Sequence, residues 1–196
     1  KKINSINDFK GLKMRIPGLA AEVLNRMGGT AIALPGGEIM PALQSGAIDA
    51  TEWVGPWNDL AFGFYKITKF YYGPGIHEPS SVLECSINLD SFNSLPIDLK
   101  NILKVACEAE NNRMLSEFTA ANSDAQQKLV NEHNVEVLNF SKDIFKNMIK
   151  ISDEVVAETA SEGKINKEIY NSWKNFKKIA RKRAPFAEHG FINLST

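Results

Sequence analysis

The feature that most constrains the fold is a regular alternation of short apolar segments and amphipathic segments near the start of the chain. Strands are predicted at residues 12–16, 30–34 and 48–51, and helices at residues 19–27 and 38–44. Gly28 and Gly29 close the first helix, and Pro41 is tolerable only in the first turn of the second. Strand, helix, strand, helix, strand at this spacing predicts parallel β-α-β units and an α/β fold.

Two charged residues stand where predicted strands end. Pro17-Gly18 follows Arg15 after one more strand residue. Glu52 and Trp53 follow the third strand in a Gly/Pro-rich turn. Ligands in parallel sheets bind beyond the carboxyl ends of the strands. A guanidinium presents a planar fork that matches a carboxylate, whereas a glutamate and a backbone carbonyl are oxygen ligands for Na⁺ or Ca²⁺. The pattern predicts a site for one anion and one cation.

The remainder of the chain is predicted to be mainly helical. Further strands are expected at residues 67–72, 81–89 and 135–138. A helix from about residue 96 to 131 either bridges two lobes or breaks near residues 120–123, and helices follow at 141–161 and 164–183.

Charge and composition exclude several classes of partner. With 23 basic and 23 acidic residues the net charge is zero, which favours neither nucleic acid nor an anionic membrane. The basic run from Lys174 to Arg183 lies on a predicted helix whose other face carries Trp173, Phe176 and Ile179, so a solvated helical face is the better interpretation. No stretch approaches the roughly 18 to 20 apolar residues that cross a bilayer.

The reactive side chains show no catalytic pattern. His77, His133 and His189 have no spacing that suggests a site, and no phosphate-binding loop is present. Cys85 and Cys107 lack metal-site spacing. Cys85 is predicted in a strand and Cys107 in a helix core, each packing as a small hydrophobe, and a disulfide between them is not favoured.

Three segments carry a specific family resemblance. They are LKMRIPGLAAEVLNRMGG, ALPGGEIMPALQSGAIDATEWVGPWNDLAFGFYK and YYGPGIHEP. Together they closely resemble the substrate-binding proteins of tripartite ATP-independent periplasmic (TRAP) transporters, in the branch that binds 2-oxo acids and related small carboxylates. The resemblance runs nearly end to end.

The resemblance implies a fold and a location. It implies the two-lobed α/β fold of the type II-like periplasmic binding proteins, with this chain as the C-terminal portion with long helices. Residues 1–52 would form an incomplete α/β substrate-binding lobe, residues 53–95 the hinge return and strands, and residues 96–196 the long bridging helix, a short strand and the closing helices. No signal peptide opens the chain, so a periplasmic location and a longer precursor are expected from the resemblance alone.

The resemblance also implies roles for individual residues. Arg15 would clamp the substrate carboxylate, and Glu52 with the Trp53 carbonyl would hold a bridging Na⁺ or Ca²⁺. A further glutamine ligand of the family lies upstream of Lys1. Trp53, Trp57, Tyr72 and His77 are candidates for the wall against the substrate, whereas Phe64 and Tyr71 are assigned to packing. The family commonly has an aromatic residue before the histidine, and this chain has Ile76 there.

The function expected from these features is capture of a small 2-oxo or 2-hydroxy acid, without chemical conversion, and its delivery to a TRAP permease. The expected partners are therefore the small carboxylate and the membrane permease subunits, and a homodimer is compatible with the resemblance. The alternative is a sensor of the same fold with no transport role. An enzyme acting on small acids is the least favoured interpretation.

Overall fold

The computed structural model describes residues 1–75, 77–81 and 83–195 of the chain. It divides into two compact units, residues 1–145 and residues 146–196. The boundary falls early in helix α6 (Lys142–Ser161). Each unit is described by itself.

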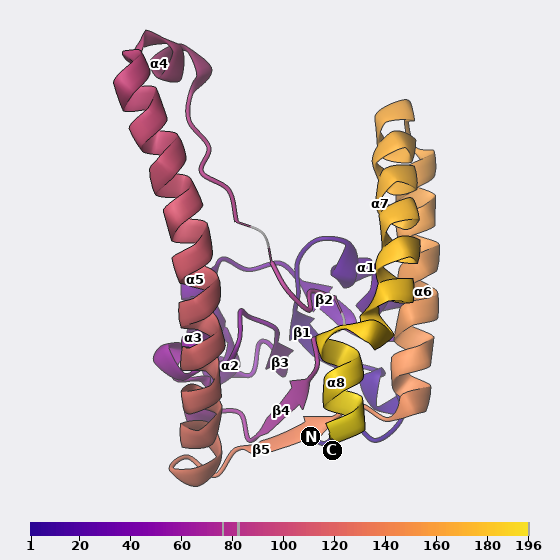
Figure 1. The fold of residues 1–196 in the computed structure, drawn as a ribbon. Coiled ribbons are helices and arrows are strands. Elements are labelled where there is room, and N and C mark those ends of the chain that lie inside the picture. Colours follow the sequence, from indigo (N-terminus) through magenta and orange to yellow (C-terminus); the bar gives the residue numbers. More distant parts are fainter. Residues whose placement is uncertain (76, 82, 196) are drawn as a thin grey trace. The chain divides into compact units, whose positions relative to one another are not determined.

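The first unit opens with a short 3₁₀ turn, η1 (Ile6–Phe9), and a three-stranded parallel sheet. Strand β1 (Lys13–Arg15) lies between β2 (Thr30–Ile32) and β3 (Ala50–Thr51) (Figure 1). Helices α1 (Leu19–Arg26) and α2 (Gly36–Ser45) make the two crossovers. The predicted β-α-β units are therefore confirmed, with each strand two residues shorter than expected.

A small apolar cluster anchors this region. Ile39 and Leu43 of α2, Ile48 before β3, and Phe64 after α3 form the cluster, and the Trp53 side chain packs against it. Phe64 was assigned to packing from the sequence, and its burial confirms that assignment. Burial of apolar surface at these positions holds α2 against the sheet.

Pro41 corrects one detail of the prediction. Helix α2 begins at Gly36, so Pro41 lies in its interior and not in its first turn. A proline there removes one helical N–H donor and leaves the carbonyl of the preceding turn without it. Pro41 and Gly37 are both exposed, so water can satisfy that carbonyl.

The chain then forms α3 (Pro56–Phe62), a 3₁₀ turn η2 (Phe64–Lys66) and strand β4 (Phe70–Gly73). Proline starts α3, and Gly63 ends it with a φ of 77°, a conformation that glycine adopts without strain. Strand β4 pairs in parallel with β5 (Glu136–Asn139), which is distant in sequence. The strand expected at 67–72 thus starts at Phe70, because the N–H groups of Ile67 and Thr68 still donate to the Phe64 carbonyl of η2, each at 2.9 Å.

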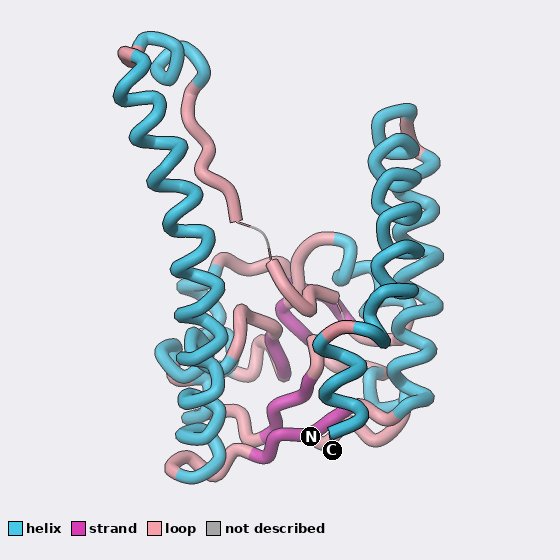
Figure 2. Tube along the Cα trace, in the orientation of Figure 1, coloured by secondary structure: helices cyan, strands magenta, loops and turns pink. Residues whose placement is uncertain are grey.

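Helix α5 (Ile97–Asn131) is one continuous helix of 35 residues that follows the short α4 (Leu89–Ser94) (Figure 2). The break considered near residues 120–123 does not occur. The C-terminal part of α5 packs into the unit through Ala125 and Leu129, and α3 lies against it.

The strand predicted at residues 81–89 is wrong for the residues that the structure describes. Residues 83–88 form no strand, and Leu89 already belongs to α4, where the Asn88 side chain accepts from the Ser91 N–H as an N-cap. Alternating apolar residues make a strand only where a neighbouring strand supplies hydrogen bonds. Cys85 and Cys107 are both exposed, so neither is the buried hydrophobe that was predicted.

The second unit comprises most of α6, then α7 (Lys164–Arg183), the 3₁₀ turn η3 (Ala184–Phe186) and α8 (Glu188–Ser195). Val155 and Ala160 of α6 are buried. The basic run lies on α7 as predicted, and its Lys177 ammonium lies 4.2 Å from the centre of the Trp173 ring. Among the described residues, no helix combines the length and the apolar character needed to span a bilayer.

Candidate functional site

The carboxyl ends of β1 and β3 bring Arg15 and Glu52 together. Arg15 is the last residue of β1 and lies opposite Thr51 of β3, and the Glu52 N–H donates to the Arg15 carbonyl at 3.2 Å. Because the strands are adjacent and parallel, their carboxyl ends meet at one edge of the sheet. The two side chains then form an ion pair with Arg15 Nη1 2.5 Å from Glu52 Oε1. The predicted juxtaposition of these two residues is confirmed.

This ion pair is largely removed from water. The side chains of Arg15 and Glu52 are 11% and 10% exposed, respectively. Arg15 Nε also donates to the Leu34 carbonyl at 3.0 Å, which fixes the guanidinium in the turn between β2 and α2. Removing a partner from such a pair leaves a charge that is poorly solvated, so each of these groups needs a counter-charge.

Trp53 closes one side of the pair. Its ring lies 5.3 Å from the Arg15 Cζ atom, and it also packs on Phe62 at 5.0 Å between ring centres. The first residue of α2 is Gly36, and a Cβ atom there would lie 2.7 Å from Trp53 Cη2. Glycine is therefore needed at this position for the indole to fit. The Trp53 Nε1 atom is buried without a hydrogen-bond acceptor among the described residues.

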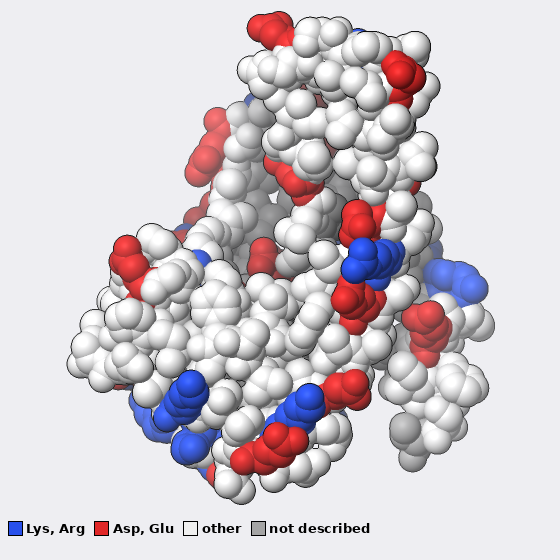
Figure 3. Space-filling model, turned by 90° about the vertical axis from the view of Figure 1, so that its left-hand side faces the viewer, with Lys and Arg blue, Asp and Glu red and all other residues white. Residues whose placement is uncertain are grey.

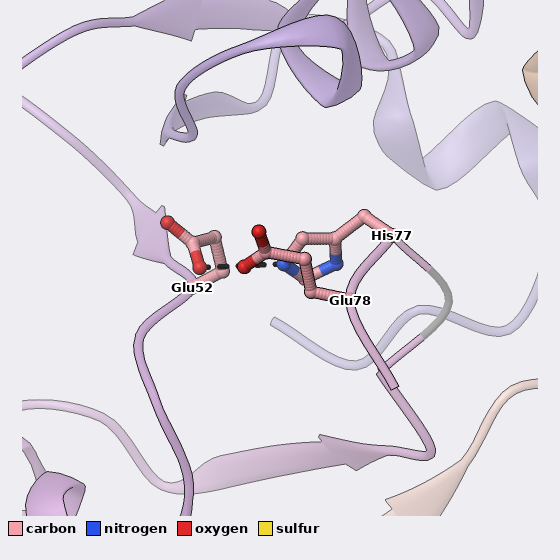
Figure 4. A group of neighbouring side chains, drawn as sticks. All are labelled: Glu52, His77 and Glu78. Carbon is pink, nitrogen blue, oxygen red and sulfur yellow. Dashed lines mark hydrogen bonds and ion pairs between the residues drawn. The ribbon is translucent and has the colours of Figure 1, made fainter. Parts of the chain in front are cut away.

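His77 and Glu78 complete a potential cation site with Glu52. His77 Nε2 lies 3.3 Å from Glu52 Oε2. One ligand atom from each of the three residues lies within 4.8 Å of the others. Figure 4 shows Glu52 reaching from the end of β3 toward His77 and Glu78, which come from the loop after β4.

The chemistry of this group suits a cation. Carboxylate oxygens bind Na⁺ and Ca²⁺, and an imidazole nitrogen suits transition metals better. Sequence reasoning missed Glu78, although it directly follows His77 in the HEP segment. Ile76, the departure from the family pattern, lies outside the described residues. The Trp53 carbonyl follows Glu52 directly in the chain, and its role as a cation ligand stays a prediction.

The structure places Trp57 and Tyr72 in other contacts. The Trp57 ring packs edge-on against Phe118 of α5 at 5.1 Å, and the Trp57 backbone N–H donates to Asn122 Oδ1 at 3.0 Å. The Tyr72 hydroxyl accepts from the Ile3 N–H at 2.7 Å, and its ring stacks on Phe140. The described contacts of both residues thus join elements of the fold, and their role in a ligand wall stays a prediction.

A second buried pair, Asp59 and Tyr71, lies in the same unit. The Tyr71 hydroxyl donates to Asp59 Oδ2 at 2.7 Å, and the Gly55 N–H donates to Asp59 Oδ1 at 3.3 Å. Burial raises the pKa of the Asp59 carboxyl, and the hydrogen bond from Tyr71 opposes that shift. The pair ties the start of α3 to β4. Tyr71 therefore has the packing role that was predicted, whereas the buried Asp59 was not foreseen.

Comparison with known proteins identifies the family. Residues 1–163 match the model of the DctP family, the bacterial extracellular solute-binding proteins of family 7. Over 178 residues the chain is 42% identical to the monocarboxylate 2-oxoacid-binding periplasmic protein of a Nostoc strain, which covers 91% of this chain and 49% of that protein.

Two solved structures share the fold closely. One is a TRAP periplasmic solute-binding protein from Colwellia psychrerythraea with bound calcium and pyruvate, with a TM-score of 0.92 and 38% identity. The other is from Pseudoalteromonas atlantica with bound sodium and pyruvate, with a TM-score of 0.91 and 37% identity. Each match covers 98% of this chain and 59% of the solved chain. This chain thus spans about half to three-fifths of the length of these relatives, and it belongs to the DctP family of extracellular solute-binding proteins.

Proposed function

We propose that this chain carries the ligand-binding part of an extracytoplasmic solute-binding protein that captures a small 2-oxo or 2-hydroxy acid together with Na⁺ or Ca²⁺. The ligand would then be delivered to the membrane permease of a TRAP transporter. The observation that carries the proposal is the buried Arg15–Glu52 pair at the carboxyl ends of two adjacent parallel strands. The family and the ligands named for the two solved relatives support the choice of ligand.

The ion pair suggests how acid and cation are coupled. Arg15 directs one nitrogen to Glu52, so a substrate carboxylate that takes the guanidinium fork competes with Glu52 for it. Displaced from Arg15, the Glu52 carboxylate would be left beside a second carboxylate in a poorly solvated site. A cation held by Glu52, with Glu78 and His77 close by, would offset that repulsion. Each of the two ligands would therefore favour binding of the other.

Trp53 and the rest of the fold would shape the site. The indole against Arg15 offers an apolar wall to the small organic part of the acid. In the two-lobed arrangement expected of the whole protein, the acid would bridge the lobes and favour the closed form through its higher affinity for that form. Residues 1–52, 53–95 and 96–196 would supply the substrate lobe, the hinge return and the bridging and closing helices. No bond is made or broken in this scheme.

Calorimetry of the full-length protein with pyruvate and lactate, with and without Na⁺ or Ca²⁺, tests the proposal. We expect Arg15→Ala to weaken acid binding about 100-fold or more, because a buried charge-assisted contact is lost. We expect Glu52→Gln to weaken binding and to abolish its dependence on the cation.

The exposed pair Arg26–Glu22 provides matched controls within the same unit. Arg26→Ala and Glu22→Gln should leave affinity and cation dependence unchanged. Unchanged affinity in Arg15→Ala would refute the clamp, and cation dependence that survives in Glu52→Gln would place the ion elsewhere.

Two further measurements separate transport from other roles. Uptake of labelled acid into vesicles that hold the permease should require this protein. If the protein were a sensor without a transport role, uptake would not depend on it. Mass spectrometry of the acid after incubation with the protein should recover it unaltered, whereas a converted product would show an enzyme. Both assays suit a protein of the periplasm, the location that the name of the Nostoc relative supports.

A further inference from the structure

The only two cysteines of the chain meet in the structure. Cys85 lies in the 83–88 stretch before α4, and Cys107 lies in α5. The Cys107 thiol is within hydrogen-bonding reach of the Cys85 thiol. Neither residue belongs to the candidate site at Glu52.

The geometry of the hairpin accounts for this contact. The 83–88 stretch leads into α4, and the chain returns from α4 along α5 (Figure 1). Four residues of extended chain between Cys85 and Leu89 cover about 13 Å at roughly 3.3 Å per residue. Ten residues of helix between Ile97 and Cys107 cover about 15 Å at roughly 1.5 Å per residue. The two cysteines thus lie at matching distances on either side of the α4 turn.

The surroundings favour a disulfide over the other uses of paired cysteines. A metal site needs further ligands, and among the described residues the group with metal-binding potential is the one at Glu52, His77 and Glu78. Both cysteines are exposed, so a soluble oxidant can reach them. Extracellular bacterial proteins, the class to which this family belongs, occupy an oxidising environment where disulfides persist.

We propose that Cys85 and Cys107 form a disulfide that fastens the 83–88 stretch to α5. In the first step one thiolate attacks a sulfur of a disulfide donor, which forms a mixed disulfide and releases one donor thiolate. The second cysteine thiolate then attacks its partner's sulfur and releases the other donor thiolate. Two protons leave the cysteines, one S–S bond forms in this protein, and the donor is reduced to its dithiol.

The disulfide would fix a segment whose other described side-chain hydrogen bonds are local. Ser86 donates to Glu84 within the stretch, and Asn88 accepts from Ser91 at the start of α4. On the far side of the turn, Lys100 of α5 donates to the Asn93 carbonyl of α4. The disulfide would add a covalent link between the two arms of the hairpin, further from α4 than the Lys100–Asn93 hydrogen bond. The chain enters this hairpin a few residues after His77 and Glu78, so the tie would also limit the motion of the loop that carries them.

Peptide mapping of the purified full-length protein tests the proposal. After incubation with oxidised glutathione, we expect a protein two hydrogen atoms lighter and a Cys85 peptide joined to a Cys107 peptide, with both released by reductant. Partial removal from water and the neighbouring Cys85 thiol raise the pKa of the Cys107 thiol, so this reaction should accelerate as the pH rises. Two free thiols after oxidation, or a mixed disulfide with glutathione that never resolves, would overturn the proposal.

Single variants make the test independent of simple folding defects. Cys85→Ser and Cys107→Ser each remove one exposed sulfur and should stay folded by circular dichroism, but each should stop at the mixed disulfide. Limited proteolysis within residues 83–88 should slow on oxidation of the wild-type protein and not on oxidation of either variant. Equal cleavage of oxidised and reduced wild-type protein would show that the cysteines do not fasten the stretch.

Discussion

The sheet region and the hairpin arm use the same residue types to opposite effect. The sheet region comprises residues 12–64, and the hairpin arm comprises residues 83–120. In the sheet region Ile39 is fully buried, whereas in the arm Ile102 is 60% exposed. Both lie on helices, and the sequence around Ile102, with Val105, Ala106 and Ala109, has apolar residues at helical spacing as α2 does. Apolar periodicity therefore indicates that a face is suited to burial, but it does not say what covers that face.

The difference has a structural cause. In the sheet region each crossover is short, so the helix returns at once to the strands that precede and follow it. Helix α5 is far longer, and its buried positions, Ala125 and Leu129, are near its C-terminal end. Figure 3 shows the α4 end of this unit as a mainly uncharged surface with scattered acidic side chains. A helix needs a neighbour along its full length to bury its apolar positions. In this structure the N-terminal half of α5 has few neighbouring residues that cover its apolar side chains.

Replacing a core isoleucine should give the largest effect that tests this comparison. Ile39→Ala should lower the free energy of unfolding by about 2–5 kcal/mol, because the fully buried side chain would leave a cavity in the cluster. The matched change Ile102→Ala should cost about 0.5 kcal/mol or less. Urea denaturation of both variants of the full-length protein measures the two values. A loss at Ile102 as large as that at Ile39 would show that the arm is covered in the whole protein.

Filling the space beside Trp53 should give an intermediate effect. In Gly36→Ala the new Cβ would lie 2.7 Å from Trp53 Cη2, so the ring must move, at a cost of about 1–3 kcal/mol. The indole fluorescence and the affinity for pyruvate should change with it. The neighbouring Gly37→Ala is the control, since a Cβ there meets nothing within 4 Å and alanine suits a helix better. If the two variants had the same stability, fluorescence and pyruvate affinity, the position of the Trp53 ring would not matter for the site.

Asp59 should give the smallest effect, visible as a dependence on pH. Its folded pKa is raised above the ordinary value of 3.8, chiefly by burial. The carboxyl therefore contributes stability that is fully present below pH 3.8 and is lost as the pH rises through its folded pKa. Unfolding measured across this acidic range should show that loss in the wild-type protein and not in Asp59→Asn. The variant Asp124→Asn, at an exposed position of α5, should keep the wild-type pH profile. If Asp124→Asn also removed the pH-dependent loss of stability, Asp59 would not be the source of that loss.

The sequence predicted best those parts of the site that lie at the ends of predicted strands. Arg15 ends β1 and Glu52 directly follows β3, so their meeting follows from the parallel pairing of these two strands. Glu78 and the Asp59–Tyr71 pair depend on how the segments around β4 pack onto that unit, which no local pattern encodes. For Trp57 and Tyr72, the described contacts are with α5, Ile3 and Phe140, at separations that sequence spacing cannot reveal.

The sequence by itself determined the alternation of strands and helices, the family, and the position of one arginine and one glutamate at the carboxyl ends of two strands. These depend on local preferences and on short crossovers, whose outcome a few adjacent residues control. Only the tertiary structure decided that residues 83–88 form no strand, that Cys85 meets Cys107, and that half of a long helix leaves its apolar face exposed. Those outcomes depend on whether a distant segment supplies a hydrogen-bonding edge, a thiol or a covering surface, and the energy of each contact exists only once both segments are in place.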